Sequence, residues 1–194
     1  MSGEIARVTL RVTQAFEQLQ VPYAIVGSLA SALHGVMRAT LDVDIVADMT
    51  LAHLPPLVEA LSAEFYTDDE MMREALEQRG NFNLIHYETA FKVDVFICKL
   101  RAFDRLELAR RRRMTITSEP WTEAYVASAE DIVLSKLEWY RVGGETSERQ
   151  WRDVVGVLKV CANILDSDYL HRWATELKVG DLLSRALREA GLSQ

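Results

Sequence analysis

The sequence predicts a mixed α/β domain followed by an all-helical segment. Short apolar runs with strand-like spacing alternate with helical periodicity over the first part of the chain, whereas every segment from Ser128 onward has helical spacing. Hydrophobic residues make up 49% of the 194 residues, which is enough to build a core. We therefore expect an α/β domain over residues 1–120 and a helical C-terminal subdomain over residues 121–194.

The α/β part begins with a helix and a short buried strand. Apolar residues recur at helical spacing over residues 4–19, and Val21-Pro22 ends that helix because proline disfavours a helical conformation at the preceding residue. The strand follows over residues 23–26. The further elements expected in this part are helices over residues 28–34, 50–65 and 69–78, and strands over residues 41–46, 81–88, 91–98 and 114–117. Gly35 is expected to cap the first of these helices, and the strands over 81–88 and 91–98 are expected to form a hairpin.

The helical part begins at a capping signal. Ser128 is a favourable N-cap residue, and the acids Glu130 and Asp131 fall in the first turn, where the helix dipole favours negative charge. Three more helices are expected over residues 147–165, 168–177 and 181–189.

Composition excludes several classes of protein. The formal net charge of −7 argues against a non-specific nucleic-acid coat protein. Cys98 and Cys161 lie far apart in apolar runs and are expected to be buried thiols in a reducing cytosol. The first residues, MSGEIARV, do not resemble a signal peptide, and no apolar run approaches the ~18 residues of a membrane span. A cytoplasmic protein with no membrane partner is therefore expected.

Three aspartates form the main candidate site. Alternate residues of a strand share a face, so Asp42 and Asp44 in "LDVDIV" point away from the buried side. Asp94 in "FKVDVF" joins them if the two strands are neighbours. Crowded carboxylates repel each other, and a hard divalent cation such as Mg²⁺ relieves that repulsion. A solvated strand face is the alternative interpretation of an Asp-x-Asp pair.

Gly27-Ser28 precedes these acids and favours the metal interpretation. Glycine lets a phosphate approach the backbone, the following helix begins with free N–H groups, and the Ser28 hydroxyl is a further donor. A nucleotide bound through its phosphates at this turn would reach cations held by Asp42 and Asp44.

These residues together resemble the polymerase-β-like nucleotidyltransferases. The resemblance rests on Gly27-Ser28, Asp42-x-Asp44 and the later Asp94, and it covers most of residues 21–160. Within that superfamily the chain is similar to the AbiEii-type proteins of abortive-infection and toxin–antitoxin systems. Two further segments support this: "SAEDIVLSKLEWYR", with Glu130 or Asp131 followed by Lys136, and "RQWRDVVGV", with Arg152-Asp153.

The resemblance implies a fold and an activity. The fold is a small mixed sheet flanked by helices, followed by a helical subdomain. The activity is Mg²⁺-dependent transfer of a nucleotide from an NTP, with two ions expected, to a hydroxyl of RNA such as tRNA or of a partner protein. Asp42, Asp44 and Asp94 would be catalytic and hold metal. The residues that would bind the nucleotide are Gly27, Ser28, Arg38, Thr40 and Lys136.

The fourth motif departs from the family pattern. A second acid often follows the first by three residues, but here that position is Gly156. Asp153 is therefore open to two interpretations, a role in positioning the acceptor or a surface pair with Arg149. Lys136 likewise could contact a triphosphate or be an exposed helical lysine.

The arginines at positions 110–113 also have two interpretations, a phosphate contact or a solvated charge run. Two other functions remain open: a non-catalytic antitoxin or regulatory module on the same fold, and a nucleotidyltransferase that modifies a small molecule such as an antibiotic.

Overall fold

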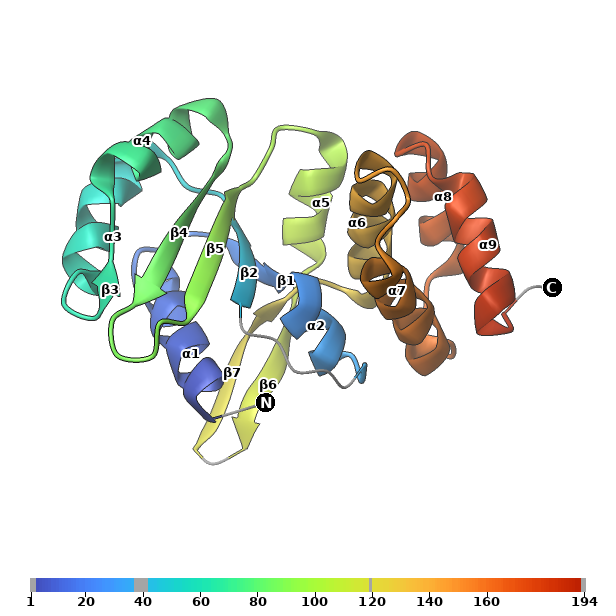
Figure 1. Ribbon diagram of the computed structural model, residues 1–194, viewed down its shortest axis with the longest axis horizontal. Helices are drawn as coiled ribbons and strands as arrows, with labels where there is room; N and C mark the ends of the chain where they lie inside the picture. The colour runs from blue at the N-terminus through green and yellow to red at the C-terminus, as the bar shows by residue number, and fades with distance from the viewer. Residues whose placement is uncertain (1–2, 37–41, 119, 193–194) are drawn as a thin grey trace. The chain divides into compact units, whose positions relative to one another are not determined.

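The computed structural model describes residues 3–36, 42–118 and 120–192 (Figure 1). The chain divides into two compact units, one made of Met1–Leu29 and Ala39–Val126 and the other of Ala30–Arg38 and Ala127–Gln194. This division is less simple than the expected boundary after residue 120, because residues 30–38 group with the helical unit and residues 121–126 group with the sheet.

The first unit is built on a seven-stranded mixed sheet with the order β3-β4-β5-β2-β1-β7-β6. Its strands are β1 (Tyr23–Val26), β2 (Asp42–Ala47), β3 (Phe65–Tyr66), β4 (Asn81–His86), β5 (Lys92–Ile97), β6 (Arg112–Ser118) and β7 (Trp121–Val126). The pairs β2–β5 and β1–β7 are parallel, and the other neighbouring pairs are antiparallel. The predicted mixed α/β architecture is therefore confirmed, including the hairpin of β4 and β5.

The two faces of this sheet differ in burial. Val43, Ile45 and Ala47 of β2 have no exposed surface, whereas the residues between them are half-buried. Figure 1 shows β4, β5 and β2 with no helix in front of them. The period-two alternation of the sequence thus gives one core face and one accessible face.

The helices of the first unit are α1 (Gly3–Gln18), α3 (Leu54–Leu61), α4 (Asp69–Gln78) and α5 (Ala102–Arg110), and α2 (Gly27–Leu33) begins in it. The helix predicted over residues 50–65 is shorter, because it is preceded by a 3₁₀ turn (Leu51–His53) and followed by β3. Prolines occupy the first turn of α3, where a missing N–H costs least, so the α-helix begins only at Leu54. The sequence prediction also missed β7, whose polar residues alternate with the buried Ala124 and Val126.

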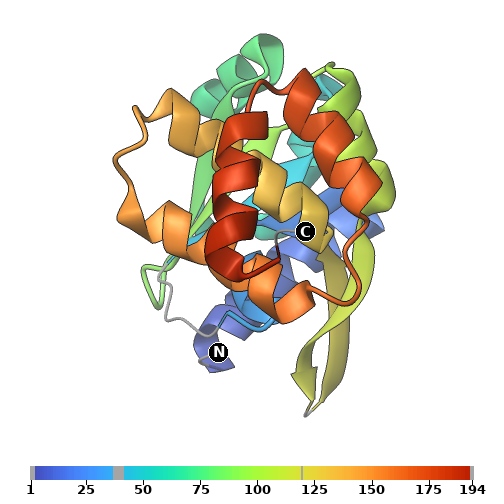
Figure 2. The same ribbon diagram turned by 90° about the vertical axis from the view of Figure 1, so that its right-hand side faces the viewer.

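The second unit contains four helices among the described residues after Val126: α6 (Ala129–Val142), α7 (Glu148–Cys161), α8 (Ser167–Glu176) and α9 (Gly180–Ala190) (Figure 2). The predicted cap Ser128 accepts a hydrogen bond from the backbone N–H of Asp131 at 3.2 Å. Ser147 and Asp166 cap α7 and α8 in the same way.

Both cysteines are buried with free thiols, as the sequence predicts. Burial raises the pKa of Cys98 to about 11 and also raises that of Cys161. None of the helices in the described part of the chain combines the length and the apolar character needed to cross a bilayer.

Candidate active site

The three aspartates lie on the accessible face of the sheet, on two neighbouring strands. β2 and β5 are parallel, and their register places Asp44 directly beside Asp94. Asp42 lies two residues earlier on β2, on the same face. The condition set by the sequence, that the two strands be neighbours, is therefore met. We call Asp42, Asp44 and Asp94 the carboxylate cluster.

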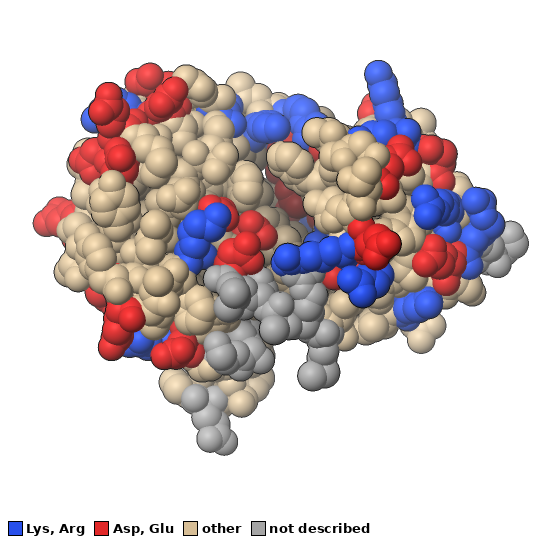
Figure 3. Space-filling model, in the orientation of Figure 1, with Lys and Arg blue, Asp and Glu red and all other residues tan. Residues whose placement is uncertain are grey.

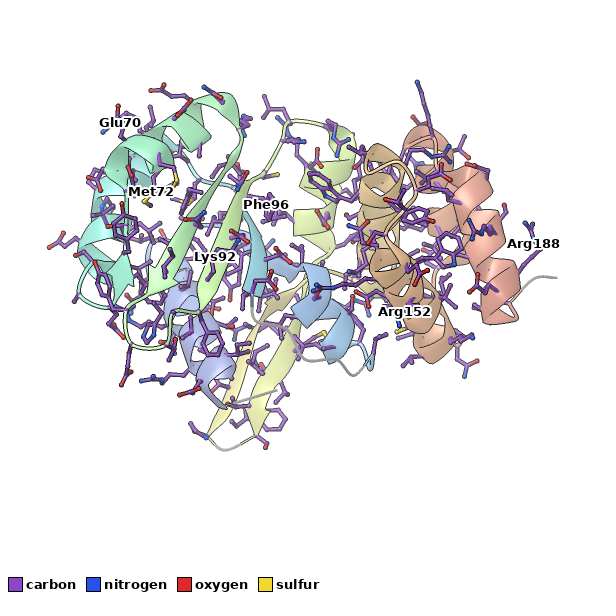
Figure 4. The ribbon with its side chains drawn as sticks, in the orientation of Figure 1. Glu70, Met72, Lys92, Phe96, Arg152 and Arg188 are labelled. Carbon is purple, nitrogen blue, oxygen red and sulfur yellow. The ribbon has the colours of Figure 1, made fainter. Side chains whose placement is uncertain are left out.

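Lys92 supplies a cation to this cluster. Its register partner is Asp42, and its Nζ lies 2.8 Å from Oδ2 of Asp94. The hydrogen bond to Asp94 raises the pKa of Lys92, and the negative charges of all three aspartates raise it further. In Figure 4 Lys92 lies on β5, and Figure 3 shows acidic and basic side chains meeting over β5 and β2.

Gly27 brings the chain close to Asp44. Val26, the last residue of β1, is the register partner of Asp44 on β2. Gly27 has a φ of +64°, and a Cβ at this position would lie 2.0 Å from Oδ2 of Asp44. From the sequence, this glycine was expected to let a phosphate approach the backbone. The structure gives a second reason, because a side chain at position 27 would overlap the carboxylate of Asp44.

The carboxylate cluster is the candidate magnesium site. Among the described residues, no group of three or more His, Cys, Asp and Glu side chains is arranged to hold a metal ion. The carboxylate of Asp94 is turned to Lys92 instead. The donor chemistry nevertheless fits the ion, because Mg²⁺ takes one or two carboxylates together with substrate phosphates. The ammonium of Lys92 shows that this face already holds a positive charge among the aspartates.

Lys136 and Asp153 form a buried ion pair within the second unit. Lys136 on α6 donates to Oδ2 of Asp153 on α7 at 2.9 Å, and the side chains are only 10% and 6% exposed. The interpretation of Lys136 as an exposed helical lysine is therefore wrong, and so is a surface position for Asp153. Ile132, Val133, Leu137 and Tyr140 on the same helix are also buried.

The acids at the start of α6 have structural partners. Asp131 accepts hydrogen bonds from Ser128 Oγ at 2.7 Å and from the Tyr169 hydroxyl at 2.5 Å. Glu130 Oε1 accepts one from the backbone N–H of Asp166 at 2.9 Å. These contacts tie the N-terminus of α6 to α8.

Gly156 has a packing reason. A Cβ at this position would lie 3.0 Å from a methyl group of Val36. A second acid on α7, as in the family pattern, would therefore require Val36 to shift by a few tenths of an ångström.

No family model and no curated protein matches the sequence. Solved structures do match. An antigenic nucleotidyltransferase-like protein from Paracoccidioides brasiliensis is 19% identical, with a TM-score of 0.59 over 97% of this chain and 94% of that one. The antibiotic-resistance factor ANT(2'')-Ia is 10% identical, with a TM-score of 0.57 over 97% of this chain and 99% of that one. A lincomycin-bound lincosamide antibiotic adenylyltransferase is 14% identical, with a TM-score of 0.52 over 82% of this chain and 98% of that one.

The chain has the nucleotidyltransferase fold. At sequence identities of 10–19%, the similarity to these structures concerns the fold alone. Membership of the AbiEii-type group stays a prediction. The roles assigned to the site residues are likewise predictions. Arg38 and Thr40 lie outside the described residues.

Sequence reasoning missed Lys92 at this site. The signal was present, since Lys92 precedes Asp94 by two residues in "FKVDVF" and so shares its face. Asn83 was missed for another reason: it lies beside Asp94 only through the pairing of β4 with β5.

Proposed function

We propose that this protein transfers a nucleoside monophosphate from a nucleoside triphosphate to a hydroxyl group of an acceptor. One observation carries the proposal: on a nucleotidyltransferase fold, Asp44 and Asp94 are register neighbours beside the Gly27 turn. Carboxylates brought together on an accessible sheet face are suited to binding a metal–triphosphate.

Each residue of the site has a proposed part in the reaction. Gly27 and Ser28 position the phosphate chain beside Asp44. The acceptor oxygen attacks the α-phosphorus, a new P–O bond forms, and the bond between the α-phosphorus and the bridging oxygen breaks to release pyrophosphate. Asp94 takes the proton of the acceptor hydroxyl. Lys136 belongs to the second unit, where its pairing with Asp153 gives the ammonium a fixed position, and its role as a phosphate contact stays a prediction from the family resemblance.

Magnesium held by the carboxylate cluster would neutralise the phosphates and stabilise the leaving pyrophosphate. The chain's own contribution is to set Asp42, Asp44 and Asp94 at fixed register positions on two adjacent strands. Before a nucleotide binds, the ammonium of Lys92 partly offsets the negative charge of the three aspartates.

The acceptor and setting are proposed from the family resemblance. RNA such as tRNA, or a hydroxyl of a partner protein, would be the acceptor in a toxin–antitoxin or phage-defence system. A cytoplasmic location is part of the same proposal and is supported by the two free, buried thiols.

A label-transfer experiment tests the function. The protein is incubated with Mg²⁺ and each NTP labelled at the α-phosphate, together with total RNA, lysate protein or a panel of antibiotics. We expect label on one acceptor pool, and the pool identifies the acceptor class. Asp44→Asn is expected to abolish transfer, whereas Asp48→Asn, the same change at an exposed residue just beyond β2, is expected to leave it intact.

Two outcomes contradict the proposal. If no pool is labelled but calorimetry shows Mg–NTP binding that Asp44→Asn removes, the protein is a binding module on this fold. If Mg–NTP does not bind and no label is transferred, the carboxylate cluster has neither role.

A further inference from the structure

The first unit contains a pocket that is separate from the carboxylate cluster. Its volume is about 310 Å³, which is within the size range of small-molecule sites. The residues that line it are Glu17, Gln20, Val21, Pro22, Tyr23, Arg111, Arg113 and Tyr125. They come from the end of α1, the start of β1, the end of α5 and the hairpin of β6 and β7.

The pocket and the carboxylate cluster are built from different residues. The lining of the pocket includes none of the three aspartates and neither Gly27 nor Ser28. On β1 the pocket is lined by Tyr23 at the start of the strand, whereas Val26 at its end is the register partner of Asp44. The pocket is therefore a site separate from the cluster.

Two arginines of the four-arginine run meet in the pocket over one aromatic ring. The guanidinium carbons of Arg111 and Arg113 lie 4.7 Å and 5.1 Å from the ring centroid of Tyr125. Arg111 also donates to the carbonyl of Leu108. A guanidinium held over an aromatic ring is pre-oriented, so less entropy is lost when it binds an anion.

The charge of the lining is positive. Glu17 is the one acid among the described residues that line the pocket, and it accepts a hydrogen bond from the Tyr23 hydroxyl at 2.8 Å. It also forms an ion pair with Arg113, whose Nη2 lies 3.3 Å and 3.4 Å from the two carboxylate oxygens. Burial raises the pKa of Tyr23, so its hydroxyl stays protonated and adds no negative charge. Two cations against one carboxylate make this a basic site in a chain with a net charge of −7.

We propose that this pocket is a second, metal-independent binding site for the phosphate group of a nucleotide, either free or within an RNA strand. The planar forks of Arg111 and Arg113 suit phosphate oxygens, which accept paired N–H donors. The exposed apolar surface of Pro22 suits the attached sugar or base. A cationic ligand would be repelled, and an uncharged ligand would leave the arginine donors unused.

Binding in EDTA tests this site apart from the carboxylate cluster. Fluorescently labelled AMP and a short labelled single-stranded RNA are titrated by anisotropy at low salt, with inorganic phosphate as competitor. We expect binding without metal, and no change on Asp44→Asn. A much higher affinity for RNA than for AMP identifies a strand as the ligand, whereas similar affinities identify a mononucleotide.

Matched variants locate the site. Arg111→Gln with Arg113→Gln is expected to weaken binding at least about tenfold, because each change removes a charged donor. Arg112→Gln removes the same charge from the exposed residue between them, which does not line the pocket, and is expected to change affinity less than about twofold.

A second pair of variants leaves Arg111 and Arg113 in place. Gln20→Glu adds a carboxylate to the lining at an exposed position and is expected to weaken binding about fivefold or more. Gln18→Glu, also exposed but outside the lining, is expected to have little effect. The proposal is overturned if neither probe binds in EDTA, or if Arg112→Gln and Gln18→Glu weaken binding as much as the lining variants.

Discussion

Lys92 is expected to compete with divalent metal for the carboxylate cluster. Its ammonium lies 2.8 Å from Asp94, and the side chains of the pair are 44% and 13% exposed. Such a partly exposed pair contributes about 1 kcal/mol after solvent screening. A metal ion that binds Asp94 must break this pair, so its binding free energy is reduced by the same amount.

The variant Lys92→Met therefore has two opposite effects. Without metal it should lower the free energy of unfolding by about 1 kcal/mol, which corresponds to about 2–4 °C in Tm for a chain of this size. With metal it should raise the affinity of the nucleotide-free protein for Mn²⁺ about fivefold, since 1.4 kcal/mol corresponds to tenfold. The Tm difference from the wild type should then shrink in millimolar Mg²⁺, because the ion stabilises the variant more.

The assay is Mn²⁺ binding by electron paramagnetic resonance, together with melting curves in EDTA and in Mg²⁺. Arg7→Met is the control, because Arg7 pairs with Glu88 at the same 2.8 Å on the surface of the same unit and is not expected to alter metal affinity. Unchanged or weaker Mn²⁺ binding by Lys92→Met would refute the competition.

Three further predictions concern stability. Gly27→Ala should destabilise the protein by at least about 1 kcal/mol more than Gly144→Ala. Both glycines have positive φ, but only at Gly27 would the Cβ meet a carboxylate. Chemical denaturation measures the free energy of unfolding of both variants, and equal losses would contradict the collision. Lys136→Met should lower the free energy of unfolding by about 3–5 kcal/mol, because it leaves Asp153 buried and unpaired. Adding Asp153→Leu to this variant should restore most of that stability. Denaturation curves in which the double variant is no more stable than Lys136→Met would contradict this prediction. The Cys98 thiol has a pKa of about 11 when folded and about 9 when unfolded, so the unfolded state releases its proton first. The free energy of unfolding should therefore fall by up to about 1.4 kcal/mol per pH unit between those values, and Cys98→Ala should flatten that decline.

The elements with clear periodicity could be predicted from the sequence. The alternation in "LDVDIV" and "FKVDVF" predicted which side chains avoid the core, and the structure places them so. The N-terminal cap of α6 could also be predicted, because Ser128 and the acids after it interact within one helical turn. The prediction failed where a local signal competed with another, as in residues 50–65, where prolines and β3 shorten the expected helix.

Other features depend on contacts between distant segments. The burial of Lys136 is set by Asp153 on another helix, and a helical lysine without such a partner would be exposed. The clustering of Arg111 and Arg113 over Tyr125 requires the pairing of β6 with β7, a strand that the sequence prediction missed.

The sequence alone determined the chemistry available to this protein: three aspartates at strand positions that face away from the core, a glycine before a short helix, and a run of arginines. Only the tertiary structure decided which of these groups meet. Strand order and register are fixed by pairing between segments far apart in the chain, and that pairing places Asp94 beside Asp44 and Lys92 beside Asp42. Local periodicity specifies the face of a strand on which a side chain lies but not the neighbour of that strand, because the hydrogen bonds that join strands are made between backbones and are the same for every sequence.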